Sequence, residues 1–106
     1  MEIRFLFFRE CPYAESALRV LREALTEEGL DANVEVIAIE TEEQARRYKF
    51  LGSPSIQING QDIEEARRKD PPFFGCRIYE GGGEKTGIPP KAMILEAIKR
   101  AKDVTS

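Results

Sequence analysis

The chain has 106 residues, of which 42% are hydrophobic and 33% charged, with 16 basic side chains, 19 acidic ones and no histidine. This length suits one domain with its own core, so we expect a single domain over residues 1–106. A net charge of -3 lacks the basic excess of nucleic-acid-binding proteins, and without histidine the usual imidazole base and the commonest transition-metal ligand are missing.

No apolar run reaches the length of a membrane span, and the N-terminal residues lack the pattern of a secretory signal. We therefore expect a cytoplasmic protein with no membrane partner. Thiols stay reduced in the cytoplasm. Cys11 and Cys76 are thus expected to be catalytic, metal-binding or simply buried, and not a permanent disulfide.

The first half of the chain predicts a β-α-β-α order. Residues 3–8 are bulky on both faces, as in a central strand buried inside a sheet. Apolar residues then recur at helical spacing, with Pro12 expected at the first helical position. Residues 34–39 predict a second strand, parallel to the first. Residues 41–44 have the pattern of a capping box, which predicts a short helix ending at Gly52.

The second half begins with a predicted hairpin. Asn59-Gly60 is the strongest short-range signal for a tight turn, and a two-residue loop there pairs Ile56 with Ile63. The first strand of this hairpin should run away from the end of the sheet that carries Cys11, and the second should run back towards it.

The remaining residues predict an excursion, a short strand and a helix. Residues 64–75 are charged and then rich in proline, which indicates an irregular loop with one helical turn. Residues 76–79 are expected to form a short strand, and residues 81–83 a flexible turn. A helix should start at residues 89–90. The resulting β-α-β-α-β-β-α order predicts an α/β fold, with one small mixed four-stranded sheet and helices on both faces.

Cys11 lies where the first strand ends and the following helix begins. A helix N-terminus presents unpaired amide groups and partial positive charge, and it favours the thiolate, the form that attacks disulfides and binds soft metals. Free cysteine is also among the most buried residue types, so an inert packed thiol is the alternative. At this junction we favour a functional thiol.

The order of elements, together with two motifs, resembles the thioredoxin fold, and this resemblance covers nearly the whole chain. Residues 11–14, Cys-Pro-Tyr-Ala, are similar to the Cys-Pro-Tyr-Cys of glutaredoxins, with Ala14 in place of the second cysteine. Ser53-Pro54 stands directly before the third strand. The resemblance implies that Cys11 is the redox nucleophile, that Pro54 is a cis-proline facing it, and that the Ser53 backbone pairs with a bound thiol peptide.

The cis bond also has a physical basis, because only a bond that precedes proline adopts the cis form at small cost. An ordinary trans Pro54 that stops the preceding helix is the alternative. Pro12 and Tyr13 are expected to contact the substrate. Arg77 is either an anion contact for a substrate carboxylate or a surface arginine.

Ala14 excludes the usual second thiol within one helical turn, so another group must resolve a mixed disulfide. Glutathione or another small thiol is one candidate, acting as a co-substrate and not as a bound cofactor. Cys76 is the other, provided that the loop over residues 64–75 brings it within the Cα separation of about 4.4 to 6.8 Å that a disulfide needs. A buried filler role for Cys76 is equally open.

The leading hypothesis is therefore a thiol-disulfide oxidoreductase acting on a protein disulfide or a small-molecule thiol. A redox-inactive binding module with the same fold is the second. The third is handling of a soft cation such as Hg(II) or Cu(I) by Cys11 and Cys76. We expect no four-ligand zinc site without histidine, and no nucleotide site in the glycine run.

Overall fold

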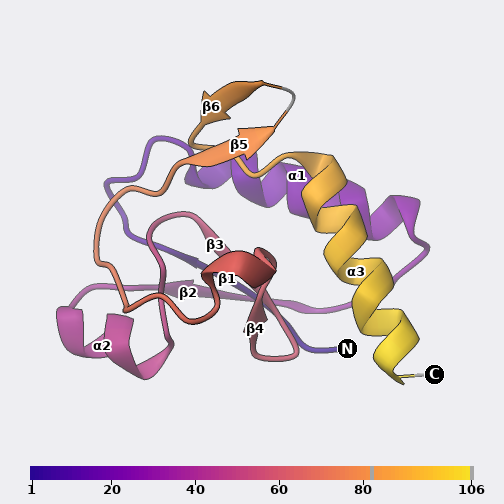
Figure 1. Cartoon of the computed structure of the whole chain (residues 1–106), viewed down its shortest axis with the longest axis horizontal. Coiled ribbons are helices and arrows are strands. Elements are labelled where there is room, and N and C mark those ends of the chain that lie inside the picture. The colour runs from indigo at the N-terminus through magenta and orange to yellow at the C-terminus, as the bar shows by residue number, and fades with distance from the viewer. Residues whose placement is uncertain (82, 106) are drawn as a thin grey trace.

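Four strands form one mixed sheet in the computed structural model of the chain, which describes residues 1–81 and 83–105, with side chains as far as residue 103 (Figure 1). The strand order is β2-β1-β3-β4. β1 (Ile3–Phe7) is parallel to β2 (Val34–Ala38) and antiparallel to β3 (Ser55–Ile58), which pairs with β4 (Gln61–Asp62). The predicted mixed sheet, its central first strand and its parallel first pair are confirmed.

The alternation of side chains along β1 builds a core on each face of the sheet. Ile3 and Phe5 point to one face, and Leu6 points to the other. Because bulky side chains leave β1 on both faces, each face must be covered by helices. This is the arrangement that the sequence predicts.

Helices cover the two faces unequally. α1 (Ala14–Glu27) and α3 (Lys91–Thr105) lie together over one face, and α2 (Glu42–Arg47) covers the other (Figure 1). The larger core includes Phe5, Leu21, Ile56, Ile94 and Ile98. The smaller core consists of Leu6, Ile39, Ala45 and Phe50. The end of α3 is also held to α1, since the ammonium group of Lys102 donates to the backbone carbonyl of Glu28 over 3.1 Å.

The predicted capping box starts α2. The Thr41 hydroxyl accepts from the backbone N–H of Gln44 over 3.1 Å, and the Gln44 side chain accepts from the N–H of Thr41 over 3.2 Å. The predicted end at Gly52 is wrong, because α2 ends at Arg47 and Lys49 turns the chain with a φ of 55°. Residues 49–54 are therefore not helical. They run back towards the sheet and contain the Ser53-Pro54 bond.

The predicted hairpin is confirmed between β3 and β4. Both turn residues have positive φ angles, 53° at Asn59 and 80° at Gly60, as a two-residue hairpin loop requires. The N–H of Ile63 donates to the carbonyl of Ile56 over 3.1 Å, so these two residues pair as expected. The register places the next polar residue of the hairpin, Asp62, beside Gln57 of β3.

The excursion over residues 64–75 contains one 3₁₀ turn, Glu65–Arg67, as predicted. The strand expected at residues 76–79 is displaced, because β5 spans Tyr79–Gly81 and Cys76 makes only an isolated bridge. β5 pairs with β6 (Glu84–Thr86), a strand that the sequence pattern did not reveal, and the two form a separate hairpin above α1 (Figure 1). Gly82, part of the predicted flexible turn, lies outside the described residues.

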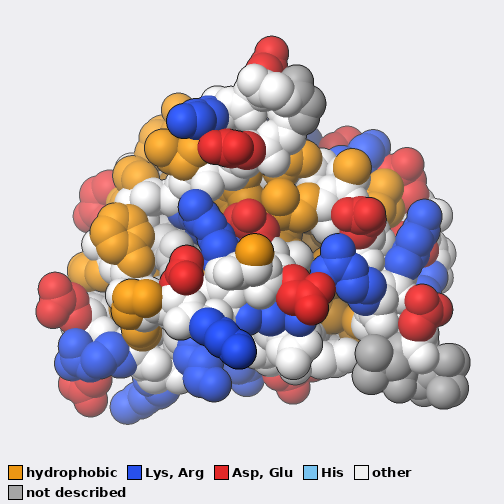
Figure 2. Space-filling view, viewed as in Figure 1, with side chains coloured by type: hydrophobic (Ala, Val, Ile, Leu, Met, Phe, Trp, Pro, Cys, Tyr) orange, Lys and Arg blue, Asp and Glu red, His pale blue; other side chains and the backbone are white. Residues whose placement is uncertain are grey.

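The surface carries acidic and basic side chains in mixture, as Figure 2 shows for one face. The Cα radius of gyration is 12.8 Å, close to the value of about 13 Å that a compact chain of this size has. None of the helices in the described part of the chain combines the length and apolarity needed to cross a bilayer.

Candidate functional site

Cys11 closes a turn directly after β1. Its backbone N–H donates to the carbonyl of Phe8 over 3.0 Å, and the residue is buried, with 9% of its surface exposed. Arg9, in the same turn, forms an exposed ion pair with Glu40 at 3.2 Å. The positive charge nearest in sequence to the thiol is therefore engaged by a carboxylate.

Pro12 and Tyr13 connect this turn to α1. The prediction that Pro12 is the first helical residue is wrong by two positions, because Tyr13 is the N-cap and α1 begins at Ala14. A weak hydrogen bond, 3.5 Å from the N–H of Ala14 to the carbonyl of Cys11, closes the intervening turn. Pro12 and Tyr13 are both exposed, and the Tyr13 ring lies so close to Gly87 that any side chain there would overlap it. A substrate contact for these two residues stays a prediction.

The Ser53-Pro54 peptide bond is cis, so the expectation of a cis-proline is confirmed and the trans alternative is wrong. Both residues are buried. Gly52, just before them, has a φ of 107°, and a Cβ on it would lie 2.9 Å from the Cβ of Arg77. Only glycine satisfies both the dihedral angle and the close approach of the segment that follows Cys76.

Ser53 connects the two cysteine-bearing segments. Its N–H donates to the carbonyl of Gly75 over 2.7 Å, and its carbonyl accepts from the N–H of Arg77 over 3.0 Å, so Cys76 lies opposite it in a parallel bridge. Its hydroxyl accepts from the N–H of Phe8 over 3.2 Å. Because Phe8 also holds the N–H of Cys11, two successive hydrogen bonds join Ser53 to the Cys11 turn.

These bonds correct the role expected of the Ser53 backbone. The resemblance implies that a bound thiol peptide pairs with Ser53, yet its N–H and carbonyl already pair with residues 75–77 of the same chain. The end of the excursion therefore lies beside Ser53, and the approach of Cys76 to Cys11 stays a prediction. Both cysteines are free thiols, and Cys76 is exposed, so the alternative of a buried filler at Cys76 is wrong.

Arg77 is buried, and the expectation of a surface arginine is wrong. Its guanidinium donates to both carboxylate oxygens of Asp62, over 2.8 and 2.7 Å, and to Glu64 over 2.9 Å. It also donates to the hydroxyl of Ser55 over 3.0 Å, and its Nε is buried without a partner among the described residues. Because two carboxylates of the protein hold this side chain, the structure does not favour Arg77 as an anion contact for substrate.

Burial and neighbouring charged groups have opposite effects on the pKa values of Arg77 and Tyr79. Burial opposes the charge of Arg77, but the hydrogen bond to Asp62, the electrostatic effects of Tyr79 and Asp62 and the hydrogen bond to Glu64 together outweigh it. The pKa of Arg77 is therefore raised and the guanidinium stays charged. The centroid of the Tyr79 ring lies 4.5 Å from the Arg77 guanidinium carbon, and the Tyr79 hydroxyl donates to the carbonyl of Pro54. Burial raises the pKa of Tyr79, and the charge of Arg77 offsets part of that shift.

Asp62 and Glu64 are the residues of this region that sequence reasoning missed. Asp62 follows the polar turn of a hairpin, where an acidic residue is expected to be solvated. Only the alternation of Asp62 and Glu64 around a buried Ile63 hinted that both carboxylates point to the same side. Their partner, Arg77, is far away in sequence and had no visible pattern to connect it to them.

The comparisons assign the chain to a family. The model of the family described as domain of unknown function DUF2703 matches residues 13–98. The chain belongs to the DUF2703 family. The matched part begins after Cys11 and includes Ser53, Pro54, Cys76 and Arg77. Neither the search of curated proteins nor that of solved structures gives a match.

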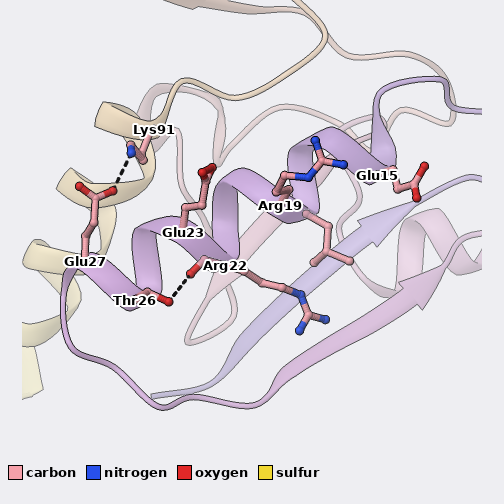
Figure 3. Close-up of a pocket in the computed structure, with 8 residues that line it drawn as sticks. Glu15, Arg19, Arg22, Glu23, Thr26, Glu27 and Lys91 are labelled. Atoms are coloured by element: carbon pink, nitrogen blue, oxygen red, sulfur yellow. Dashed lines mark hydrogen bonds and ion pairs between the residues drawn. The ribbon is translucent and has the colours of Figure 1, made fainter.

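A groove on this DUF2703 protein lies apart from both cysteines, along α1 (Figure 3). Its lining is mostly charged, and Lys91 at the start of α3 closes one end through a 2.7 Å ion pair with Glu27. The hydrogen bond to Glu27 raises the pKa of Lys91. Among the described residues, no group of three or more His, Cys, Asp or Glu side chains is placed to hold a metal ion. A two-thiol site for a soft cation stays a prediction.

We predict that Asp62→Ala strongly destabilises the fold, because it leaves the guanidinium of Arg77 buried with one carboxylate fewer. The free energy of unfolding in urea should fall by about 3 to 5 kcal/mol. Glu43→Ala is the control: its 4.0 Å pair with Arg47 is exposed, so the loss should stay below about 0.5 kcal/mol. The double variant Asp62→Leu/Arg77→Met should recover most of the loss. Equal effects of Asp62→Ala and Glu43→Ala would contradict the account of this network.

We also predict a loss of stability at alkaline pH that depends on Tyr79. Burial raises the folded pKa of Tyr79 above the unfolded value of about 10. The contribution of Tyr79 to the free energy of unfolding is therefore complete below about pH 10 and decreases as the pH rises further. The free energy of unfolding should therefore fall above about pH 10, and Tyr79→Phe should reduce this fall. Urea unfolding at a series of pH values measures both. Identical pH profiles for the two proteins would refute the prediction.

Proposed function

We propose that the protein is a thioredoxin-like thiol-disulfide oxidoreductase of the cytoplasm, with Cys11 as its nucleophile. The order of the first six elements, the mixed four-stranded sheet and the helices on both faces support this fold. So does the cis bond at Pro54, directly before β3. The hairpin of β5 and β6 before α3 is an addition to the predicted pattern.

The single observation that carries the proposal is the position of Ser53. It pairs with Cys76 on one side, while its hydroxyl holds the strand end from which the Cys11 turn departs. A thiol that resolves a mixed disulfide must come close to the attacking thiol. Connection through one buried residue supports Cys76 in that role, which Ala14 cannot fill.

The proposed chemistry needs two exchanges. The Cys11 thiolate attacks one sulfur of a substrate disulfide, the substrate S–S bond breaks, and the second substrate sulfur leaves as a thiolate. The Cys76 thiolate then attacks the Cys11 sulfur and releases the first substrate sulfur. The substrate has gained two electrons, and the protein holds a disulfide between Cys11 and Cys76. Two molecules of a small thiol such as glutathione reduce it by the same reaction and become a disulfide.

A redox-inactive binding module is the second candidate. It is favoured by the limited exposure of Cys11, 9%, and by Ala14, which packs partly buried against the larger core where a second thiol would stand. On this hypothesis the protein keeps the partner-binding surface of a thioredoxin-like fold and has lost redox turnover. Cys11→Ser would then leave partner binding intact and change no measurable activity.

Cysteine variants test the proposal directly. In an assay of disulfide reduction with a protein substrate, Cys11→Ser should reduce turnover to background because no nucleophile remains. Cys76→Ser should retain the first attack, so intact-mass measurement should detect a mixed disulfide on Cys11. An excess of small thiol should then restore turnover.

The variant Ala14→Cys/Cys76→Ser supplies a matched control. It moves the resolving thiol into the motif, at the third position after Cys11, and turnover should recover without added small thiol. Full activity of Cys11→Ser, or no reaction of the native protein with any disulfide, would sink the proposal. In the second case the binding module becomes the better description.

A further inference from the structure

Residues 76–78 form an exposed backbone edge beside the Cys76 thiol. Ser53 uses the carbonyl of Gly75 and the N–H of Arg77, so it occupies one side of this segment. In a parallel bridge the residue opposite Ser53 directs its own N–H and carbonyl to the other side. For Cys76 these two groups have no partner among the described residues, and the same is true of Ile78.

The burial pattern shows the same two sides. Cys76 and Ile78 are exposed, while Arg77 and Tyr79 between and beyond them are buried. Alternation with a period of two is typical of an extended strand, so the side chains of Cys76 and Ile78 leave the same face. An extended segment with free backbone groups is a ready template for pairing with another strand.

The surroundings of this edge are apolar. Phe73 and Ile78 are 54% and 55% exposed, unusually high values for large hydrophobic side chains, and Phe74 is 41% exposed. Leu51, Pro71, Phe73 and Ile78 line a cleft together with Cys76. The ring of Phe74 also packs edge-on against Phe8, with 6.1 Å between the ring centroids. The apolar surface therefore continues to Phe8, the residue after β1 that begins the Cys11 turn.

The charges around the cleft favour one class of occupant. Arg77 is held by Asp62 and Glu64, and Arg67, at the rim, lies 3.8 Å from Glu64. The Asp70 carboxylate lines the cleft without a cationic partner among the described residues. Glutathione, with two carboxylates, would meet this anion and find both arginines already paired. A neutral or basic apolar polypeptide avoids the conflict.

We propose that residues 76–78 are the docking edge for the substrate, and that the substrate is an extended polypeptide with a bulky apolar side chain close to its disulfide. The polypeptide pairs with the N–H and carbonyl of Cys76 and places the apolar side chain against Phe73 and Ile78. This inference rests on the proposed function for its chemistry. It differs from the sequence-based expectation, because the docked chain pairs with Cys76 and not with Ser53.

Amide hydrogen exchange tests the docking edge without any redox step. The double variant Cys11→Ser/Cys76→Ala keeps the backbone and removes both thiols. In the free variant the amide of residue 76 should exchange rapidly, whereas the amides of Ser53 and Arg77, which are hydrogen-bonded, should be protected. A neutral peptide with a serine in place of cysteine, flanked by phenylalanine and leucine, should protect the amide of residue 76.

Methylated peptides separate backbone pairing from apolar contact. Methylation of each peptide nitrogen in turn should weaken binding about tenfold at the position that donates to the carbonyl of residue 76, and little at its neighbours. Phe73→Ser in the same double variant should weaken binding about tenfold by removing the apolar contact. Val36→Ser, at a similarly exposed apolar residue on β2, is the matched control and should change nothing.

Each outcome has a clear meaning. No protection of the residue 76 amide, or equal binding of all methylated peptides, overturns the docking edge even if the native protein reduces disulfides. The peptide could instead increase the protection of the Ser53 amide and leave the amide of residue 76 unchanged. That result would place peptide docking at Ser53 and would also overturn the docking edge. Docking as predicted in a protein that reduces no disulfide would uphold the edge and refute the proposed function.

Discussion

Two backbone hydrogen bonds and one side-chain hydrogen bond at Ser53 determine the arrangement of the candidate site. The backbone bonds pair Ser53 with residues 75–77, and the hydroxyl holds Phe8 at the end of β1. The long excursion after β4 therefore returns to the sheet end from which Cys11 departs. This contact connects the segment of the buried Cys11 to the segment of the exposed Cys76.

The buried ion pair of Arg77 and Asp62 stabilises the pairing of Ser53 with residues 75–77. Arg77 follows Cys76 directly, so its attachment to Asp62 and Glu64 fixes the segment one residue after the thiol. A buried guanidinium that lost its carboxylates would be strongly unfavourable, which restricts the segment to this position. The exposed Cys76 thus sits on a backbone held on both sides of it, by the carbonyl of Gly75 and by Arg77.

Local signals in the sequence predicted the scaffold well, because each depends on neighbouring residues. The capping box at Thr41 and the Asn59-Gly60 turn are examples. The cis bond at Pro54 was instead implied by the family resemblance, which combines it with the distant Cys11-Pro12 motif. The environment of Arg77 could not be predicted in this way. Its partner Asp62 lies across a loop of irregular structure, and a lone arginine beside polar residues has the same local pattern whether it is solvated or buried.

The same reasoning explains the errors at the ends of elements. Pro12 is compatible with a first helical position, but the extra turn that closes on Cys11 moves the start of α1 to Ala14. Ser53 was expected to offer its backbone to a peptide, and only the fold shows that residues 75–77 take that place. The edge that remains open is therefore one strand further out, at Cys76.

Controlled oxidation of the purified protein tests most directly whether Ser53 brings the two thiols within reach of each other. The account predicts an intramolecular disulfide, seen as a loss of two hydrogen atoms by intact mass and as a cross-linked pair of peptides containing Cys11 and Cys76. Ser53→Gly should slow its formation, since it removes the hydroxyl that holds Phe8. Oxidation that yields only dimers through Cys76, with Cys11 unreacted in the monomer, would contradict the account.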